Sequence, residues 1–561
     1  MSLTCGFKSR LAHVNVLSRR LFLGASSAAT AAAALHSAAT GEPEEESAEN
    51  DDAEAGETAG TVTIAGIHRP ASLDPGLATD AETERVIRQI YEPLVGIDPD
   101  TGSVAPLLAE EWEVSQDELT YTFTLRQDVV FHDGNELTAE VVVSNFERWG
   151  QLDYLYGYGN ISLSAPLAFP TVFGGFTSSE ECVLESVEAE DDRTVVLTLT
   201  TPVVYLLQAL TLPAFGIASA EVLVDNDPGL ASRAATGTGP YRLAPAESEE
   251  DGPLTLEAFG DYWDSAEGPA EVIIRALPKS FDRLRELQRG QADVYDLITS
   301  DNLRSLVQSG RLILQRDPFS VLYMGFNLDH PVMSDGLVRQ AAARAVNRPQ
   351  LVDSLFLDGS RPAYQFIPAA LAVHSDTALQ HSYSLELAQE LLEDSGYDGE
   401  PLDFYYPMTT TRSYLPRPEA VFAAIAADLT AAGFTIRPKP VRWSDGYVDQ
   451  LMGDSSRAMH LLGRNGGFRS PHTFFSPLFG QPSREFNFHD EDVIDLLNSA
   501  RSETDEDERT ELYQEVADLI QDELPALPLA YPISGLALGS RVADYPMSPV
   551  LNERFSEIRM A

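Results

Sequence analysis

The chain has 561 residues, of which 43% are hydrophobic, so it is long enough to bury several cores. Its formal net charge is −49, from 87 acidic and 38 basic residues, and only three of the basic residues are lysines. A nucleic-acid site needs a basic patch to neutralise phosphates, and the sequence has none, which argues against nucleic acid as a partner. The acids are spread over the whole chain, which favours a solvated surface adapted to high salt over a local site for cations or basic partners.

The N-terminus predicts export. Residues 18–23 read Ser-Arg-Arg-Leu-Phe-Leu and precede an alanine-rich run that is too short for a comfortable membrane span. Paired arginines before a short apolar segment are typical of a twin-arginine signal, which exports an already folded protein. We therefore predict that residues 1–40 form the signal, and the sequence leaves open whether it is cleaved near Ala38 or kept as an anchor. Cys5 precedes the apolar run, so lipidation there is not supported.

Residues 41–60 predict a disordered tether. This stretch is rich in Asp and Glu and has no large apolar residue, so it cannot contribute to a core. Beyond it only Cys182 remains, and we expect no intrachain disulfide. Asn160 begins an Asn-Ile-Ser sequon, and whether it is glycosylated stays open.

Strands and helices alternate from residue 61 onward. Period-two alternation predicts strands, and apolar spacing of three and four residues predicts helices. In the first half, the predicted strands cover 61–66, 119–126, 194–200 and 271–277, and the predicted helices cover 139–149 and 281–288.

The second half continues the same alternation. The predicted helices cover 335–346, 419–432, 445–452 and 506–524, and the predicted strands cover 402–406, 435–441 and 458–462. Strands interleaved with helices predict an α/β fold with open sheets. The last of these strands is followed by residues 463–471, with the sequence Gly-Arg-Asn-Gly-Gly-Phe-Arg-Ser-Pro. Open α/β sheets commonly build binding crevices at such strand ends.

No catalytic arrangement is recognisable. The chain has no HExxH, GxSxG, Walker or CxxC motif, and the glycines of residues 463–471 lack the spacing of a phosphate-binding loop. The nearest group of histidines is His460, His472 and His489, whose spacing favours ordinary histidines over metal ligands. We therefore expect a protein that is not an enzyme and has no metal or cofactor, and an exported hydrolase is the less favoured alternative.

One long segment identifies a family. Residues 104–149 resemble the signature of the extracytoplasmic solute-binding proteins of family 5, which serve peptide and nickel ABC importers. The matching parts occur in the family's order, including Trp112, the 121–126 strand, the Phe131–Gly134 turn and the helix that follows. Further landmarks follow in order at 236–243, 260–264, 338–352, 387–397 and 511–530.

The resemblance implies a two-lobed, periplasmic-binding-protein-like fold of the cluster C type, with a hinge and an extra subdomain in the first lobe. We expect the first lobe at 61–318, the second lobe at 319–526, and a return of the chain to the first lobe at 527–561. Such a protein captures a small ligand between its lobes and delivers it to the permease of an ABC importer. We expect a monomer on the outer face of the membrane or outside the cell. The acidity suggests a halophilic archaeon.

The resemblance also implies binding residues in the second lobe. Residues 408–422 resemble the dipeptide-binding subgroup, which has an arginine, a tyrosine and a proline where this chain has Arg412, Tyr414 and Pro416. In that subgroup the arginine binds the α-carboxylate of the ligand, a task that suits the planar guanidinium fork. Arg412 could instead be a surface loop arginine.

The second binding segment is residues 463–471. Peptide-binding relatives carry a tryptophan after the first glycine and, three positions later, an aspartate that pairs with the ligand ammonium, but this chain has Arg464 and Gly467. We predict ligand contacts from Arg464, Gly467, Phe468 and Arg469, and no free dipeptide bound in the usual way. An anionic or N-blocked peptide or another small acid fits better. A neutral oligosaccharide, nickel or a metallophore, and a sensor role stay open, as does the alternative that both arginines pair with surface acids.

Overall fold

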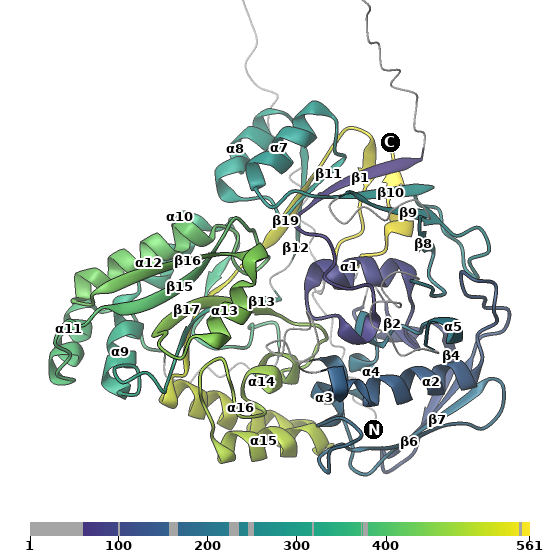
Figure 1. The fold of residues 1–561 in the computed structure, drawn as a ribbon, viewed down its shortest axis with the longest axis horizontal. Helices are drawn as coiled ribbons and strands as arrows, with labels where there is room; N and C mark the ends of the chain where they lie inside the picture. The colour runs from purple at the N-terminus through teal and green to yellow at the C-terminus, as the bar shows by residue number, and fades with distance from the viewer. Residues whose placement is uncertain are drawn as a thin grey trace, which may run out of the picture.

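The computed structural model describes residues 60–98, 101–155, 167–223, 235–244, 252–316, 319–371, 373, 380–548 and 553–561. The predicted signal, the predicted tether up to residue 59 and the Asn160 sequon lie outside the described residues. Two large β-sheets organise the rest, one in each lobe, and Figure 1 shows the second lobe, in green, beside the first.

The first lobe is built on a seven-stranded mixed sheet. Its strands, in spatial order, are β12 (Leu312–Arg316), β19 (Ser534–Leu538), β11 (Val294–Asp296), β1 (Thr61–Gly66), β10 (Glu271–Ala276), β9 (Leu254–Ala258) and β8 (Tyr241–Leu243). The helices associated with it are α1 (Ala81–Ile90), α5 (Ala220–Leu223), α7 (Ser280–Arg289) and α8 (Ser300–Gln308). Two two-stranded antiparallel sheets pair β2 (Val95–Ile97) with β3 (Val104–Pro106) and β20 (Val542–Asp544) with β21 (Arg559–Met560).

A subdomain within the first lobe has its own antiparallel sheet and core. The strand order is β4 (Ala109–Val114), β5 (Thr120–Leu125), β7 (Thr194–Leu199) and β6 (Leu184–Ala189). The inward residues of β5 alternate with its half-buried threonines, as the period-two pattern predicts. Its core is completed by α2 (Ala139–Gly150), α3 (Ala168–Phe173) and α4 (Leu206–Ala209).

Short 3-10 turns occur along the whole described chain, at η2 (Pro75–Leu77), η3 (Leu152–Leu155), η4 (Pro213–Phe215), η5 (Trp443–Asp445) and η6 (Phe555–Glu557).

The second lobe is a three-layer α/β unit around a six-stranded sheet. Its strands are β14 (Arg361–Pro362), β18 (Ala526–Tyr531), β13 (Ser320–Phe326), β17 (Met459–Asn465), β15 (Leu402–Met408) and β16 (Ile436–Arg442). Every residue of β13 is buried, because helices cover both faces of the sheet. One face packs on α9 (Gly336–Ala345), α10 (Arg348–Leu355), α11 (Leu385–Asp394) and α12 (Pro418–Ala432). The other packs on α13 (Tyr447–Gly453), α14 (His472–Phe479), α15 (Glu491–Ser502) and α16 (Glu506–Glu523).

The chain crosses between the two lobes twice, and the two crossings lie side by side. At the first crossing β12 leads into β13, and at the second β18 leads into β19. β12 pairs with β19 in the first sheet, and β13 pairs with β18 in the second. The second crossing follows Tyr531, because β18 pairs within the second sheet up to that residue, whereas the bounds expected from the family resemblance place the return at residue 527. Two adjacent strand connections form a natural hinge between lobes.

The sequence predictions of secondary structure agree with the fold to within a few residues at the element ends. The clearest difference is β17, which extends to Asn465, so Arg464 lies within a strand instead of a loop. The cause is the antiparallel pairing with β13, which runs without interruption to the pair Ser320 and Asn465. Within the described part of the chain, no helix combines the length and the apolar character needed to cross a membrane.

Candidate functional site

The two predicted binding segments meet at one edge of the second sheet. β15 and β17 are parallel neighbours, so the loops that follow them leave from the same edge. Ser413, in the first loop, donates a hydrogen bond of 2.7 Å from its hydroxyl to the Asn465 side chain at the end of β17. The Tyr414 ring covers Gly463 so closely that a side chain at position 463 would overlap it. The structure therefore brings Arg412, Tyr414 and the start of the glycine-rich segment together.

Arg412 is buried and forms no ion pair with a described acid, although Glu82 of the first lobe is close enough to feel its charge. Only 8% of the residue is exposed, and its guanidinium carbon lies 3.6 Å from the centre of the Trp443 ring. Its Nε atom is buried without a hydrogen bond, and no described residue forms an ion pair with the guanidinium. The alternative of a surface loop arginine does not fit this environment.

Tyr414 closes the site from the side of the second-lobe core. It is 8% exposed and belongs to the hydrophobic cluster between the sheet and α9–α12. Burial raises the pKa of its hydroxyl to about 12, so it is a neutral donor at physiological pH. Asp80 of the first lobe is close enough to contribute to this shift, which places the N-terminus of α1 near Tyr414.

Arg464 lies within the site and Arg469 on its rim. The Arg464 Nε donates a 2.7 Å hydrogen bond to the backbone oxygen of Thr473, and burial lowers the pKa of the guanidinium. Arg469 is exposed, and its guanidinium lies against Gly102 of the first lobe. Neither arginine forms an ion pair with any described acid. The described residues therefore do not support the alternative in which both arginines pair with surface acids.

Gly467 and Phe468 connect the second lobe to the first. A Cβ atom on Gly467 would lie 2.7 Å from Cδ2 of Leu212, so a first-lobe side chain occupies the space beside this glycine. The Phe468 ring stacks on Tyr205 with 5.4 Å between ring centres and is part of the first-lobe subdomain core. Phe468 therefore packs between the lobes in this structure, and a contact with ligand remains a prediction.

The first lobe presents α1 to this edge. Asp80 caps the helix by accepting hydrogen bonds from the backbone N–H groups of Glu82 and Thr83, and Val86 and Ile87 anchor it in the core. Sequence reasoning did not predict this helix, although the cap and the apolar spacing are visible in the sequence. His68, at the end of β1, lies 3.0 Å from the hydroxyl of Thr410 across the lobes. Burial, with Arg412 and Arg283 nearby, lowers the pKa of His68 to about 3, so it is neutral.

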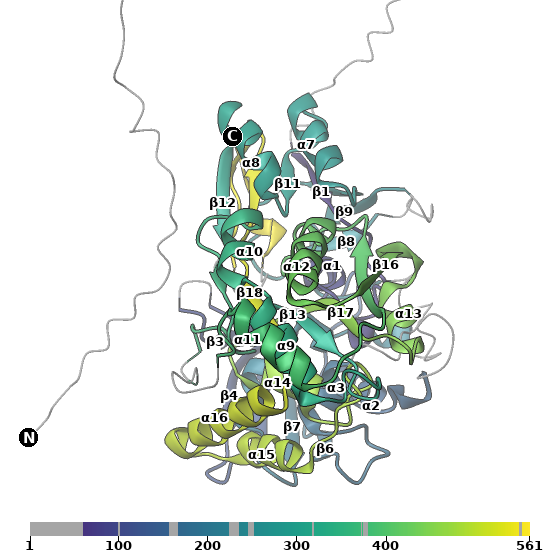
Figure 2. The ribbon, with the colours of Figure 1, turned by 90° about the vertical axis from the view of Figure 1, so that its left-hand side faces the viewer.

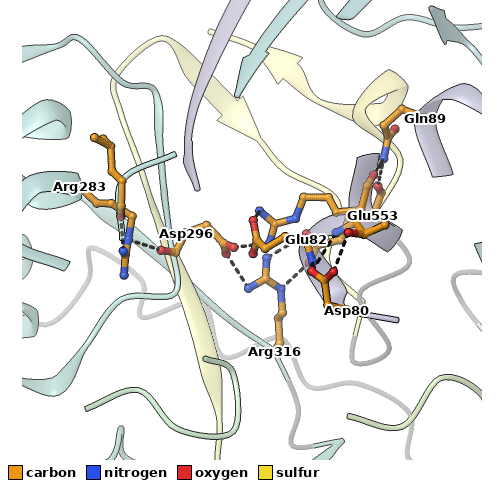
Figure 3. Close-up of polar contacts among 10 residues, drawn as sticks. Asp80, Glu82, Gln89, Arg283, Asp296, Arg316 and Glu553 are labelled. Atoms are coloured by element: carbon orange, nitrogen blue, oxygen red, sulfur yellow. Dashed lines mark hydrogen bonds and ion pairs between the residues drawn. The ribbon is translucent and has the colours of Figure 1, made fainter. Parts of the chain in front are cut away.

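A buried ionic network fixes α1 in position (Figure 3). Asp296 of β11 accepts hydrogen bonds from Arg85 of α1 and, at 2.8 Å, from Arg316 of β12. Arg316 also pairs with Glu553 of the C-terminal tail at 2.5 and 2.9 Å. Although burial opposes ionisation, Arg316 and Arg85 hold the pKa of Asp296 below its ordinary value. The network ties α1 to β12, the last strand before the first crossing.

No group of three or more His, Cys, Asp or Glu side chains suited to a metal ion occurs among the described residues. His460 is instead buried and shares Glu485 with Tyr323, at 2.8 Å and 2.9 Å respectively.

Comparison with known proteins identifies the family. Residues 103–485 match the model of the bacterial extracellular solute-binding proteins, family 5 Middle. The chain is 28% identical to Heme-binding protein A of Haemophilus influenzae over 496 residues, covering 86% of this chain and 88% of the relative. It is 26% identical to the Dipeptide-binding protein of Escherichia coli over 507 residues, covering 87% and 92%.

A solved structure shares the fold. The dipeptide binding protein from Pseudoalteromonas sp. SM9913, in complex with Met-Leu, superposes with a TM-score of 0.81 and 21% identity, covering 89% of this chain and all of the other. This match confirms the predicted two-lobed fold.

Proposed function

The chain belongs to the bacterial extracellular solute-binding proteins of family 5, and from this premise we propose that it captures a small peptide-like solute through a carboxylate group. The lobes close on the solute, and the protein delivers it to the permease of an ABC importer. The observation that supports a ligand with a carboxylate is Arg412, a buried cation that forms no ion pair with a described residue. The relatives named above bind dipeptides or heme, both of which carry carboxylates.

Arg412 differs from the other buried arginines in the part of the chain that the structure describes. Each of the others donates hydrogen bonds or forms ion pairs: Arg85, Arg148 and Arg316 with carboxylates, and Arg283, Arg339, Arg348 and Arg457 with backbone oxygens. A buried charge without a counter-ion costs free energy, so natural proteins rarely retain one. A ligand carboxylate would supply the missing anion and match the guanidinium fork with two parallel hydrogen bonds.

Calorimetry with a dipeptide and its C-terminal amide tests this proposal. We expect alanyl-leucine to bind, and removing its carboxylate by amidation to weaken binding. Arg412→Ala should weaken binding of the acid by 100-fold or more, because losing one partner of a buried charge pair costs about 3 kcal/mol or more. The same substitution should leave binding of the amide nearly unchanged.

The matched control is Arg442→Ala, which removes an exposed arginine at the end of β16. This variant should bind alanyl-leucine as the parent does. Equal affinity for acid and amide in the parent, or undiminished affinity in a folded Arg412→Ala variant, would refute the carboxylate role.

We also propose that the protein is exported as a folded monomer and acts on the outer face of the membrane in a high-salt environment. The paired Arg19 and Arg20, the acidic stretch at 41–60 and the net charge of −49 support this location. The relatives are named as binding proteins, which supports a role in capture and not in catalysis.

A further inference from the structure

One face of α1 is directed neither to the core nor to the ionic network. Val86, Ile87 and Ile90 belong to the core, and Arg85 and Gln89 belong to the network. The residues of α1 that are only partly buried are Ala81, Glu84 and Arg88. Their spacing of three and four residues places them on one stripe of the helix. Figures 1 and 2 place α1 on the side of the first lobe that faces the second.

Glu84, in the middle of this stripe, has no partner. It forms no hydrogen bond and no ion pair with any described residue. The charged groups around it are Arg88 and Asp80 on its own helix segment and Arg464 on β17 of the second lobe. Arg464 and Glu84 influence each other across the lobes without forming an ion pair. Burial of the lone carboxylate raises the pKa of Glu84 to about 7.

The loop after β17 offers no alternative acid. Gly467 stands where peptide-binding relatives have an aspartate, and Leu212 of the first lobe occupies the adjacent space. Phe468 points into the first-lobe core, and Arg469 adds positive charge. Any anion that meets a ligand ammonium must therefore come from elsewhere, and α1 presents one from the opposite lobe.

We propose that Glu84 is a specificity-determining residue that binds the ammonium group of a small zwitterionic solute whose carboxylate is held by Arg412. The inference rests on the proposed function, since it takes the Arg412 site as given. A ligand held in this way is bound by both lobes, its acid end by the second and its amine end by the first. Closure of the lobes would then complete recognition, because neither lobe holds both charged groups.

The proposal predicts a pH dependence with a definite sign. With a pKa of about 7, Glu84 is almost fully protonated at pH 5.5 and mostly ionised at pH 7.5, where an α-ammonium group is still mostly protonated. Binding a cation requires the carboxylate, so affinity for the free amine should rise with pH. If the bound carboxyl returns to its ordinary pKa, the rise is roughly 20-fold between pH 5.5 and 7.5.

Calorimetry with alanyl-leucine and N-acetyl-alanyl-leucine tests the proposal at both pH values. The parent should prefer the free amine by tenfold or more at pH 7.5 and lose most of that preference at pH 5.5. Glu84→Gln keeps the shape of the side chain but not its charge. It should abolish both the preference and its pH dependence while binding the acetylated peptide as the parent does.

Glu140→Gln is the matched control, since Glu140 is an exposed acid in the first turn of α2. Its preference and pH profile should equal those of the parent. A folded Glu84→Gln variant that keeps the preference and the pH profile would overturn the role of Glu84 and leave the proposed function standing. Failure of the proposed function is a separate result, namely that removing the carboxylate from the acetylated peptide leaves its binding to the parent unchanged.

Discussion

Arg412 is held by an aromatic ring where most buried cations are held by oxygen atoms. The Trp443 ring, in the 3-10 turn η5, contacts the guanidinium from one face at 3.6 Å. Stacking of this kind compensates part of the desolvation cost and leaves the in-plane N–H groups unused. Trp443 is therefore a positioning residue, because it orients the guanidinium without competing with a ligand for its hydrogen bonds.

Replacing Trp443 with leucine should reveal this positioning role. The stacking contributes about 1–2 kcal/mol, so we expect the affinity for alanyl-leucine to fall roughly 5- to 30-fold in calorimetry. The affinity for the C-terminal amide should change much less, because only the carboxylate depends on Arg412. Trp443→Phe keeps a ring and should retain most of the affinity. An equal loss for acid and amide would show that Trp443 only supports the local fold.

The loop at 466–471 packs against the first lobe. It leaves β17, passes Gly467 beside Leu212, and inserts Phe468 into the subdomain core next to Tyr205. His472, at the start of α14, stacks on the same tyrosine at 4.5 Å. This loop therefore joins the lobes through apolar packing.

Phe468→Ala should loosen the contact between the lobes. Closing the lobes would no longer gain the free energy of burying the Phe468 ring, so the population of open molecules should grow. The affinity for ligand should then fall by about tenfold or more. Small-angle X-ray scattering of the ligand-free protein should give a larger radius of gyration than the parent. Phe281→Ala, which removes a ring that is 64% exposed on α7, should leave both quantities unchanged. An unchanged radius in the Phe468 variant would contradict this role.

The elements that the sequence predicts well are those whose apolar pattern decides their packing. β13 was missed because both of its faces are buried, which removes the alternation that marks a half-buried strand. α1 was missed although the Asp80 cap and the apolar spacing of Val86, Ile87 and Ile90 mark it in the sequence. Its Arg85 and Gln89 are buried by a network whose other members lie far along the chain, so only the folded chain shows why these polar residues face inward. The resemblance to the family located Arg412, Tyr414 and Arg464, but Glu84 and Trp443 come from segments that only the folded chain brings together.

The whole molecule places Arg412 and Arg464 of the second lobe opposite the first-lobe helix α1, which carries Glu84, with two adjacent strand crossings between the lobes. The network of Arg85, Asp296, Arg316 and Glu553 ties α1 to β12, so the helix and the hinge strand belong to one rigid unit. We expect opening and closing to move Arg412 relative to that unit, and the proposed ligand to bridge the two sides. This arrangement predicts that the natural ligand is a small solute with a carboxylate.

Mass spectrometry of the solute that co-purifies with the protein from its native source tests this claim most directly. The protein would be isolated without denaturation, and the solute released by acid and identified by exact mass and fragmentation. We predict a peptide-like solute with a free carboxylate, present in the parent protein and lost from the Arg412→Ala variant. A neutral solute retained equally by the parent and by a folded Arg412→Ala variant would contradict the claim.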